Sequence, residues 1–167
     1  MRLFISINVP QEFHRYLRQL QSQFPDMKNT NEFHMTVQFL GDDTKSPDQL
    51  IDALKTVQFS PFEIKMGNAV PFGNPTNPRG VWIECKMIPE LEKLAEDIRK
   101  TTEKLDYIAD KPFKAHITLG RYKRPPQYKP KKIDGESHSF AINQFHLVES
   151  ALTSTGPKHK IVASFPF

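Results

Sequence analysis

Two tetrapeptides of one pattern decide how this chain is interpreted: residues 34–37 are His-Met-Thr-Val, and residues 116–119 are His-Ile-Thr-Leu. Each contains a histidine, an apolar residue, a threonine and a second apolar residue. The motifs begin 82 residues apart (116 − 34), close to half of the 167-residue chain. A single His-x-Thr arises readily by chance, whereas a pair at this spacing does not. The pair suggests a duplication and predicts two lobes related by an approximate two-fold axis.

Both motifs lie in segments with the alternating pattern of a half-buried strand, residues 31–40 and 113–121. Residues i and i+2 of a strand point to the same face, about 6.5–7 Å apart. Each motif therefore presents an imidazole and a hydroxyl side by side. If the two strands face one cleft, that cleft contains two imidazoles and two hydroxyls.

The other segments predict a mixed α+β fold. Apolar spacings of three and four predict a helix over residues 11–24 and another that begins at Pro89. A short helix over residues 47–57 is predicted by Ser46 as its N-cap and Pro47 at its first position. Apolar runs bounded by turn residues predict strands, at residues 3–9, 61–70, 79–86, 138–150 and 158–165. This order is not a regular strand–helix alternation, so α+β is favoured over a parallel sheet. We expect residues 1–167 to form one domain made of two intertwined lobes.

The composition excludes several classes of protein. Cys85 is the only cysteine, which excludes a disulfide framework and any multi-cysteine metal site. No apolar run approaches the 18 residues of a membrane span, and the first apolar run is too short for a signal peptide. We therefore expect a soluble cytoplasmic protein that does not bind a membrane. The net charge of +4 admits a polyanionic partner without establishing one.

Paired histidines suit acid–base chemistry at phosphorus. Because histidine titrates near neutral pH, one imidazole can accept a proton from an attacking water or hydroxyl while the other donates to a leaving alkoxide. The two threonine hydroxyls can hydrogen-bond phosphate oxygens as charge develops on them. This chemistry requires neither metal nor cofactor. A metal site that joins His34 and His116 to His138 or His146 is the alternative, but no carboxylate stands at ligand spacing beside either motif.

Four blocks of the sequence resemble a known family: RLFISINVP from residue 2, HMTVQFLGD from residue 34, KPFKAHITLGR from residue 111 and VESALTSTGPKHKIVASFPF from residue 148. In order and spacing they are similar to the RNA 2′,3′-cyclic phosphodiesterases of the two-histidine phosphoesterase superfamily, also described as 2′-5′ RNA ligases. The resemblance extends from the first predicted strand to the last. It implies a bilobal fold with a pseudo-two-fold cleft between two antiparallel sheets and flanking helices.

The resemblance also implies an activity and roles for the motif residues. The reaction is the metal-independent hydrolysis of a terminal 2′,3′-cyclic phosphate of RNA to a 2′-phosphate. His34 would donate a proton to the leaving 3′ oxygen, His116 would accept a proton from water, and Thr36 and Thr118 would hold the phosphate. Which histidine plays which role rests on the family alone. The reverse joining of ends through a 2′-5′ bond is implied only as a weak side activity, and the protein is expected to be a monomer.

Four residues beside the motifs are further candidates. Gln38 shares the face of His34 by alternation and could line the edge of the cleft or be solvated. Arg121 could contact a phosphate, although its parity places it opposite His116 unless the strand twists or ends there. Phe39 is expected in the core rather than stacked on a base, because it alternates with Val37. Trp82 is left open between core and cleft wall.

The loop over residues 122–132 carries five basic residues, two tyrosines and no acid. A basic run with interleaved aromatic residues suits the backbone of single-stranded RNA, so Lys123 and Arg124 are candidate substrate contacts. A solvated loop stiffened by prolines is the alternative. The histidines outside the motifs are interpreted as surface or structural residues: His14, His138, His146 and His159. Cys85 is expected in the core.

Two other functions remain open on sequence grounds. One is the same chemistry on a small cyclic nucleotide, for example ADP-ribose 1″,2″-cyclic phosphate. The other is a module that binds RNA or nucleotides without catalysis. The intact His and Thr of both motifs argue against binding alone, because binding does not need two titrating groups.

Overall fold

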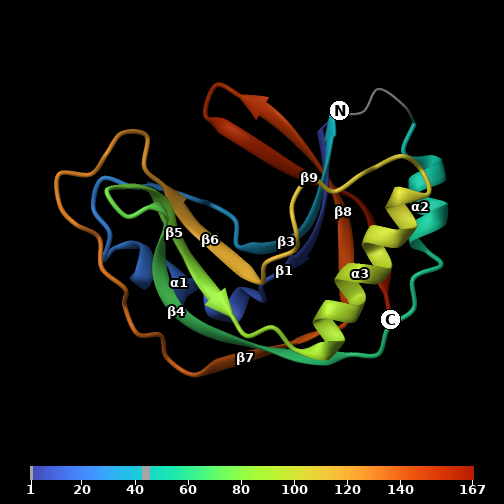
Figure 1. Cartoon of the computed structure of the whole chain (residues 1–167), viewed down its shortest axis with the longest axis horizontal. Coiled ribbons are helices and arrows are strands. Elements are labelled where there is room, and N and C mark those ends of the chain that lie inside the picture. Colours follow the sequence, from blue (N-terminus) through green and yellow to red (C-terminus); the bar gives the residue numbers. More distant parts are fainter. Residues whose placement is uncertain (1, 43–45) are drawn as a thin grey trace.

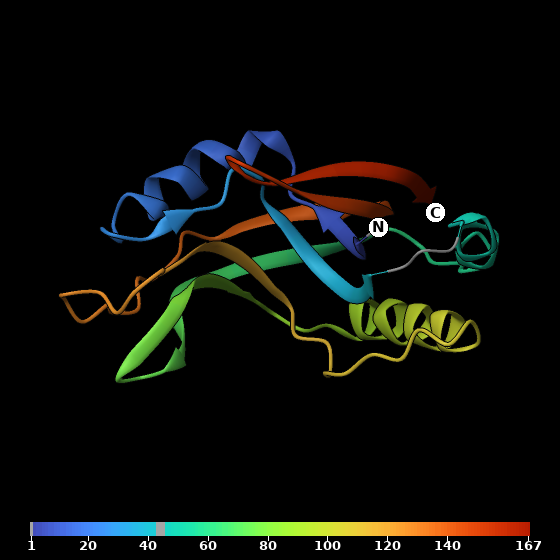
Figure 2. The ribbon, with the colours of Figure 1, turned by 90° about the horizontal axis from the view of Figure 1, so that it is seen from above.

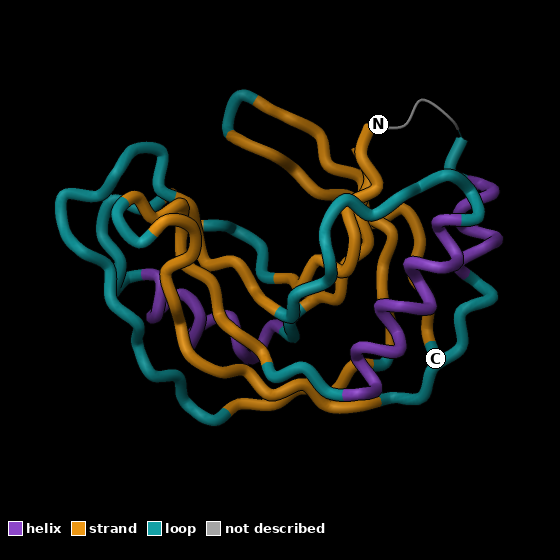
Figure 3. The backbone as a smooth tube through the Cα atoms, viewed as in Figure 1, coloured by secondary structure: helices purple, strands orange, loops and turns teal. Residues whose placement is uncertain are grey.

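The computed structural model describes residues 2–42 and 46–167, which form three α-helices, one 3₁₀ turn and nine strands (Figures 1 and 3). The helices are α1 (His14–Gln21), which follows the 3₁₀ turn Gln11–Phe13, α2 (Asp48–Leu54) and α3 (Pro89–Glu103). The strands are β1 (Arg2–Asn8), β2 (Lys28–Asn29), β3 (His34–Asp42), β4 (Phe62–Asn74), β5 (Asn77–Cys85), β6 (His116–Arg121), β7 (His138–Ile142), β8 (Gln144–Thr153) and β9 (Gly156–Pro166).

The strands form two sheets in which every pairing is antiparallel. One sheet has the order β3-β1-β8-β9 and the other the order β2-β6-β5-β4-β7. The predicted α+β class with two antiparallel sheets is thereby confirmed. Each sheet contains one motif strand, β3 or β6. Although they belong to different sheets, β3 and β6 contact each other.

The helices lie on opposite sides of the two sheets (Figure 2). Helix α1 contacts β6 and buries Leu17 and Leu20, whereas α3 contacts β3 and buries its apolar stripe, Leu91, Leu94 and Ile98 among it. Pro89 stands in the first turn of α3, where its missing N–H costs no hydrogen bond. The buried side chains of both sheets and all three helices form one continuous apolar cluster. None of the helices described is long and apolar enough to cross a membrane.

The predicted strand over residues 138–150 is wrong as a single element. The structure divides it into β7, which pairs with β4, and β8, which pairs with β1 in the other sheet. A single residue, Asn143, separates the two strands. Because no Gly- or Pro-rich turn marks the change of sheet, the sequence pattern runs on without a break.

A β-bulge lies at the fourth residue of each motif. Opposite β1, Thr36 pairs with Ser6 and Gln38 with Ile5, which leaves Val37 as the extra residue. Opposite β5, Thr118 pairs with Trp82 and Gly120 with Val81, so Leu119 is extra in the same way. A bulge places two successive residues against one partner, and it therefore reverses the alternation of faces beyond it. Beyond the fourth residue of each motif, alternation along the strand therefore no longer predicts which face a side chain occupies.

Candidate functional site

The histidine and the threonine of each motif lie on one face of their strand and are half-buried, and the two strands contact each other across the two sheets. His34 and Thr36 project from β3, and His116 and Thr118 project from β6. The two histidines interact electrostatically, since the charge of His116 is one of the causes that lower the pKa of His34. The structure thus brings together the two motifs that the sequence analysis paired.

His116 has a defined hydrogen-bonding state. Its Nδ1–H donates to the backbone carbonyl of Lys114 at 2.8 Å, because a carbonyl oxygen only accepts. In the neutral ring this leaves Nε2 with a free lone pair. Burial lowers the pKa of His116, and the charges of Arg121 and Lys114 act in the same direction, while the bond to Lys114 opposes them. His116 is therefore biased toward a neutral imidazole that can accept a proton.

His34 is the more strongly perturbed of the two. Burial lowers its pKa to about 4, and the charges of His159 and His116 contribute in that order. Its ring lies 5.3 Å from the ring of Phe4 and 5.5 Å from that of His159, measured between centroids. In the unliganded protein His34 is neutral at pH 7.

A row of stacked side chains covers the cleft face beside His116. The ring of Trp82 lies 4.2 Å from that of His116 and 4.3 Å from that of Phe72. The guanidinium of Arg121 sits over the other end of the row, 5.4 Å from the Phe72 ring. The sequence does not decide whether Trp82 lies in the core or in the cleft wall, and the structure places it in the cleft wall.

Arg121 lies on the same face as His116, contrary to its sequence parity. The expectation from strand alternation is wrong because Leu119 is the extra residue of the bulge. Thr118 pairs with Trp82 and Arg121 pairs with Gly80, and these two partners lie on the same face of β5, so Arg121 shares the face of Thr118. Burial and the neighbouring charge of Arg79 lower the pKa of Arg121. Within the described part of the chain no carboxylate pairs with Arg121, which leaves its guanidinium available to an anion.

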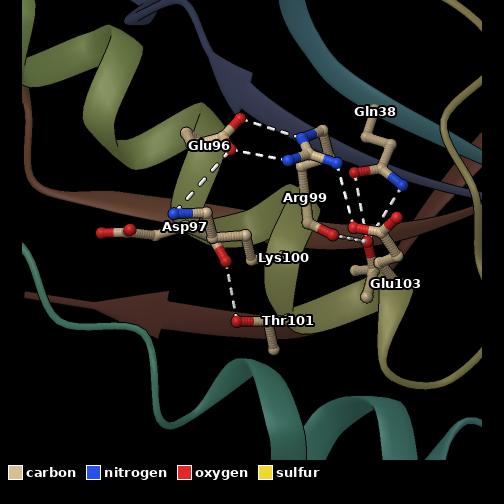
Figure 4. Close-up of polar contacts among 8 residues, drawn as sticks. Gln38, Glu96, Asp97, Arg99, Lys100, Thr101 and Glu103 are labelled. Atoms are coloured by element: carbon tan, nitrogen blue, oxygen red, sulfur yellow. Dashed lines mark hydrogen bonds and ion pairs between the residues drawn. The ribbon is translucent and has the colours of Figure 1, made fainter.

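The corresponding bulge in β3 overturns two expectations. Gln38 does not share the face of His34: it is 7% exposed, and its amide donates to the hydroxyl of Thr102 in α3 at 3.0 Å (Figure 4). Phe39 is not in the core: it is 64% exposed and pairs with Phe4 on the face of His34. Both side chains are reversed because the extra residue Val37 shifts the register by one.

A cavity of about 250 Å³ opens beside His34 in the four-stranded sheet. Ser6 lines it and is fully buried, and among residues 2–42 and 46–167 its Oγ is the one buried side-chain polar atom without a hydrogen-bond partner. Such a hydroxyl can bond to a ligand at little desolvation cost. The remaining lining residues come from β1, the segments around α1 and β3, and the β8–β9 hairpin: Phe4, Asn8, Val9, His14, Asn31, Glu32, Phe33, His34, Val148, His159 and Ile161.

Sequence reasoning missed the place of His159. It was interpreted as a surface or structural residue, but it lines the cavity and its ring contacts His34. Its Nδ1 lies 2.8 Å from Oε2 of Glu32. Glu32 and His159 are 127 residues apart, so no local pattern could have indicated the pair.

The other three histidines outside the motifs fit the structural interpretation. His14 bonds to the carbonyl of Val9, and His146 bonds to Ser164 between strands. His138, the first residue of β7, pairs with Glu136, which precedes the strand. Across the ranges that the structure describes, no group of three or more His, Cys, Asp or Glu side chains is placed to hold a metal ion.

Lys123 and Arg124 are exposed on the loop that follows β6. Tyr122 of this loop is not free to stack on a base, because its ring is buried, and its hydroxyl bonds to that of the half-buried Tyr128. The expectation of an aromatic contact with RNA is therefore wrong for Tyr122. The tyrosines anchor the loop, and its basic side chains remain exposed. Cys85 packs against the core as expected, where burial raises its thiol pKa to about 12.

Comparison with known proteins settles the family. A family model described as the 2′-5′ RNA ligase superfamily matches residues 9–152. The chain belongs to this superfamily. A relative from Archaeoglobus fulgidus named RNA 2′,3′-cyclic phosphodiesterase is 31% identical over 99% of both chains. A relative of the same name from Thermus thermophilus is 29% identical and covers 99% of this chain and 89% of its own length.

Two solved structures share the fold of this chain. The crystal structure of the Thermus thermophilus protein TT0787 superimposes with a TM-score of 0.87 at 27% identity and covers 99% of this chain and 97% of its own. A structure of E. coli LigT superimposes with a TM-score of 0.83 at 22% identity, covering 99% and 97%, which shows likeness of fold. The resemblance seen in the motif blocks is thereby confirmed.

Proposed function

We propose that this protein hydrolyses the 2′,3′-cyclic phosphate end of RNA to a 2′-phosphate, with His34 as proton donor and His116 as proton acceptor. The observation that carries the proposal is that the two motif strands, β3 and β6, belong to different sheets and contact each other, close enough for the charge of His116 to act on His34. In-line displacement at phosphorus needs an acceptor and a donor on opposite sides of the reacting atom, and two facing motifs supply that arrangement. The names of the relatives support RNA as the substrate.

His116 suits the role of acceptor. Its Nδ1–H is held by the carbonyl of Lys114, so the free Nε2 can take a proton from the attacking water. The lowered pKa keeps this nitrogen unprotonated near neutral pH. As the P–O bond to water forms, the bond from phosphorus to the 3′ oxygen breaks, and His34 delivers its proton to that oxygen.

His34 must acquire its proton for this role, because its pKa in the free protein is about 4. A cyclic phosphate carries a negative charge, and an anion placed beside an imidazole favours the protonated form. Substrate binding should therefore raise the pKa of His34. The donor would be charged when substrate is present.

The phosphate would be held by hydroxyls and by one guanidinium. Thr36 and Thr118 stand two residues after their histidines on the same face, within reach of non-bridging oxygens. Arg121 adds a positive charge on the face of His116. Lys123 and Arg124 lie beyond it, where the RNA chain that precedes the cyclic end could lie.

The test is incubation with RNA ending in a 2′,3′-cyclic phosphate in excess chelator, followed by mapping of the product. We expect 2′-phosphate ends, and a loss of at least about 100-fold in His34→Ala and His116→Ala. His138→Ala is the matched control, since His138 lies on β7 away from the motifs, and it should retain activity. Formation of a 3′-phosphate would refute the assignment of the leaving oxygen, and turnover undiminished in the motif variants would refute the mechanism.

The same assay separates the alternatives. ADP-ribose 1″,2″-cyclic phosphate, offered in place of RNA, tests a small nucleotide as the substrate. Tight RNA binding without turnover would identify a binding module instead. Joining of ends through a 2′-5′ bond is expected only as a weak reverse activity.

A further inference from the structure

Three side chains form a row at the edge of the cavity beside His34. Glu32 stands two residues before the start of β3, and its Oε2 lies 2.8 Å from Nδ1 of His159 on β9. The His159 ring in turn lies 5.5 Å from the His34 ring at an interplanar angle of 73°, and 5.0 Å from the Phe4 ring. All three polar residues of the row line the same cavity.

The row connects segments that are distant in sequence. β9 is the last strand of the four-stranded sheet, at the opposite edge from β3 in the order β3-β1-β8-β9. His159 pairs with Ser150 of β8, and Ser150 pairs with Arg2 of β1. The bond to Glu32 therefore holds the far edge of the sheet against the segment that leads into the first motif.

We propose that His159, oriented by Glu32, is a positioning residue that opposes protonation of His34 until an anionic substrate occupies the cleft. The carboxylate of Glu32 accepts the Nδ1–H and thereby holds the His159 ring beside His34. A positive charge on His159 makes a second positive charge on the neighbouring His34 costly, because like charges at this separation disfavour each other. The bond also fixes the ring plane against which His34 packs. In its catalytic consequence the inference rests on the proposed role of His34 as donor.

Among the groups that surround His34, His159 is the main one whose charge a substitution can remove. From β6 it is faced by His116, from β9 by His159, and from β1 by the uncharged residues Phe4, Ser6 and Asn8. Burial is the largest cause of its lowered pKa, His159 comes second and His116 third. Since burial is constant and His116 is itself biased toward the neutral form, the charge of His159 is the contribution that a single substitution can remove.

The groups that face His159 are equally few. Glu32 and His34 contact it directly, and His14 lines the same cavity while bonded to the carbonyl of Val9. Its neighbours along β9 are Lys158 and Lys160, of which Lys160 stands in register with Glu149 of β8. Their side chains project from the other face of the strand.

The structure also provides a matched control. His138 on β7 pairs with Glu136 at the same distance of 2.8 Å. Its ring packs against Tyr16 and Phe13 and contacts no motif residue. Removing His138 deletes an equivalent His–Glu pair without changing the surroundings of His34.

The test is an NMR pH titration of the His34 imidazole in the wild-type protein, His159→Gln, His159→Phe and the control His138→Gln. Both His159 variants should move the His34 titration upward by on the order of one pH unit. The control should leave it in place. His159→Phe retains an aromatic ring beside Phe4, so it serves if the glutamine variant fails to fold.

Kinetics supply the second measurement. Because kcat/KM reports the free enzyme, in which the pKa of the donor His34 lies below that of the acceptor His116, the acidic break of its pH profile follows His34 and should move upward in the His159 variants, while the alkaline limb should stay in place. A titration and a pH profile that both match wild type would overturn the inference while leaving the proposed function intact. A shifted titration in a protein without hydrolase activity would support the coupling and refute the proposed function, so the two failures are distinguishable.

Discussion

Phe39 and Arg121 occupy matching places in the two motif strands. Each stands five residues after its motif histidine, and each is turned onto the cleft face by the bulge at the fourth motif residue. Phe39 pairs with Phe4 in one sheet, whereas Arg121 lies over Phe72 in the other. The matching geometry supports the hypothesis of duplication. The side chains themselves differ, so that the cleft face carries an aromatic ring on the His34 side and a positive charge on the His116 side.

Arg121 is predicted to bind phosphate in the cleft. Arg121→Gln removes the charge while keeping a polar side chain, and we expect kcat/KM to fall by roughly 100-fold, because a charge-assisted contact to the reacting phosphate is lost. Steady-state kinetics on an RNA with a cyclic end measure this. Lys123→Gln, two residues later on the exposed loop, is the control and should change kcat/KM by a few-fold at most. Equal effects of the two substitutions would contradict a specific role for Arg121.

Gln38 is predicted to stabilise the fold rather than to take part in the reaction. Its amide bonds to the fully buried hydroxyl of Thr102, and that hydroxyl can donate back to the Gln38 carbonyl oxygen at 3.2 Å. Gln38→Ala should cost about 1–3 kcal/mol of the free energy of unfolding, measured by urea denaturation.

The exposed Gln144→Ala provides the comparison and should cost little. The activity of folded Gln38→Ala should match wild type. If activity falls while the free energy of unfolding does not change, the interpretation of Gln38 as a cleft residue would regain support.

Trp82 should report the protonation of His116 by its fluorescence. Trp82 is the only tryptophan, and its ring lies 4.2 Å from the His116 ring. A protonated imidazole in contact with an indole quenches its emission more strongly than a neutral one. Because burial lowers the pKa of His116 below the ordinary 6.5, the emission should fall at a pH below that value. His116→Gln should abolish the transition, and a transition that persists in this variant would contradict the assignment.

Acid should destabilise the fold through His34. Its pKa is about 4 in the folded protein and near 6.5 when unfolded, so the unfolded state binds more protons between these values. The stabilisation present above pH 6.5 is therefore lost as the pH falls toward 4. Between pH 7 and pH 5 this residue alone should account for about 2 kcal/mol of the free energy of unfolding.

Urea denaturation at the two pH values measures this loss in the wild-type protein and in His34→Gln. The variant should lose less stability on acidification, by about the same 2 kcal/mol. An identical pH dependence in both proteins would show that His34 is not protonated differently on folding.

Much of the fold follows from local patterns. The helix that begins at Pro89 was predicted because its apolar residues recur at spacings of three and four, and the structure buries Leu91, Leu94 and Ile98. The short strand Lys28–Asn29 was not predicted, since two polar residues carry no periodicity. Its place in the sheet depends on pairing with Gly120 and Arg121 of β6.

The sequence by itself determined the pair of motifs, their strands and the face shared by each histidine and threonine, because residues i and i+2 of one strand share a face in any fold. Only the tertiary structure decided the directions of Gln38, Phe39 and Arg121. Those depend on which residue lies opposite on β1 or β5, and a bulge is a property of the pairing between strands rather than of either strand alone. The position of His159 in the cavity was also decided by the tertiary structure, because its contact with Glu32, 127 residues away in sequence, exists only once the sheet has formed.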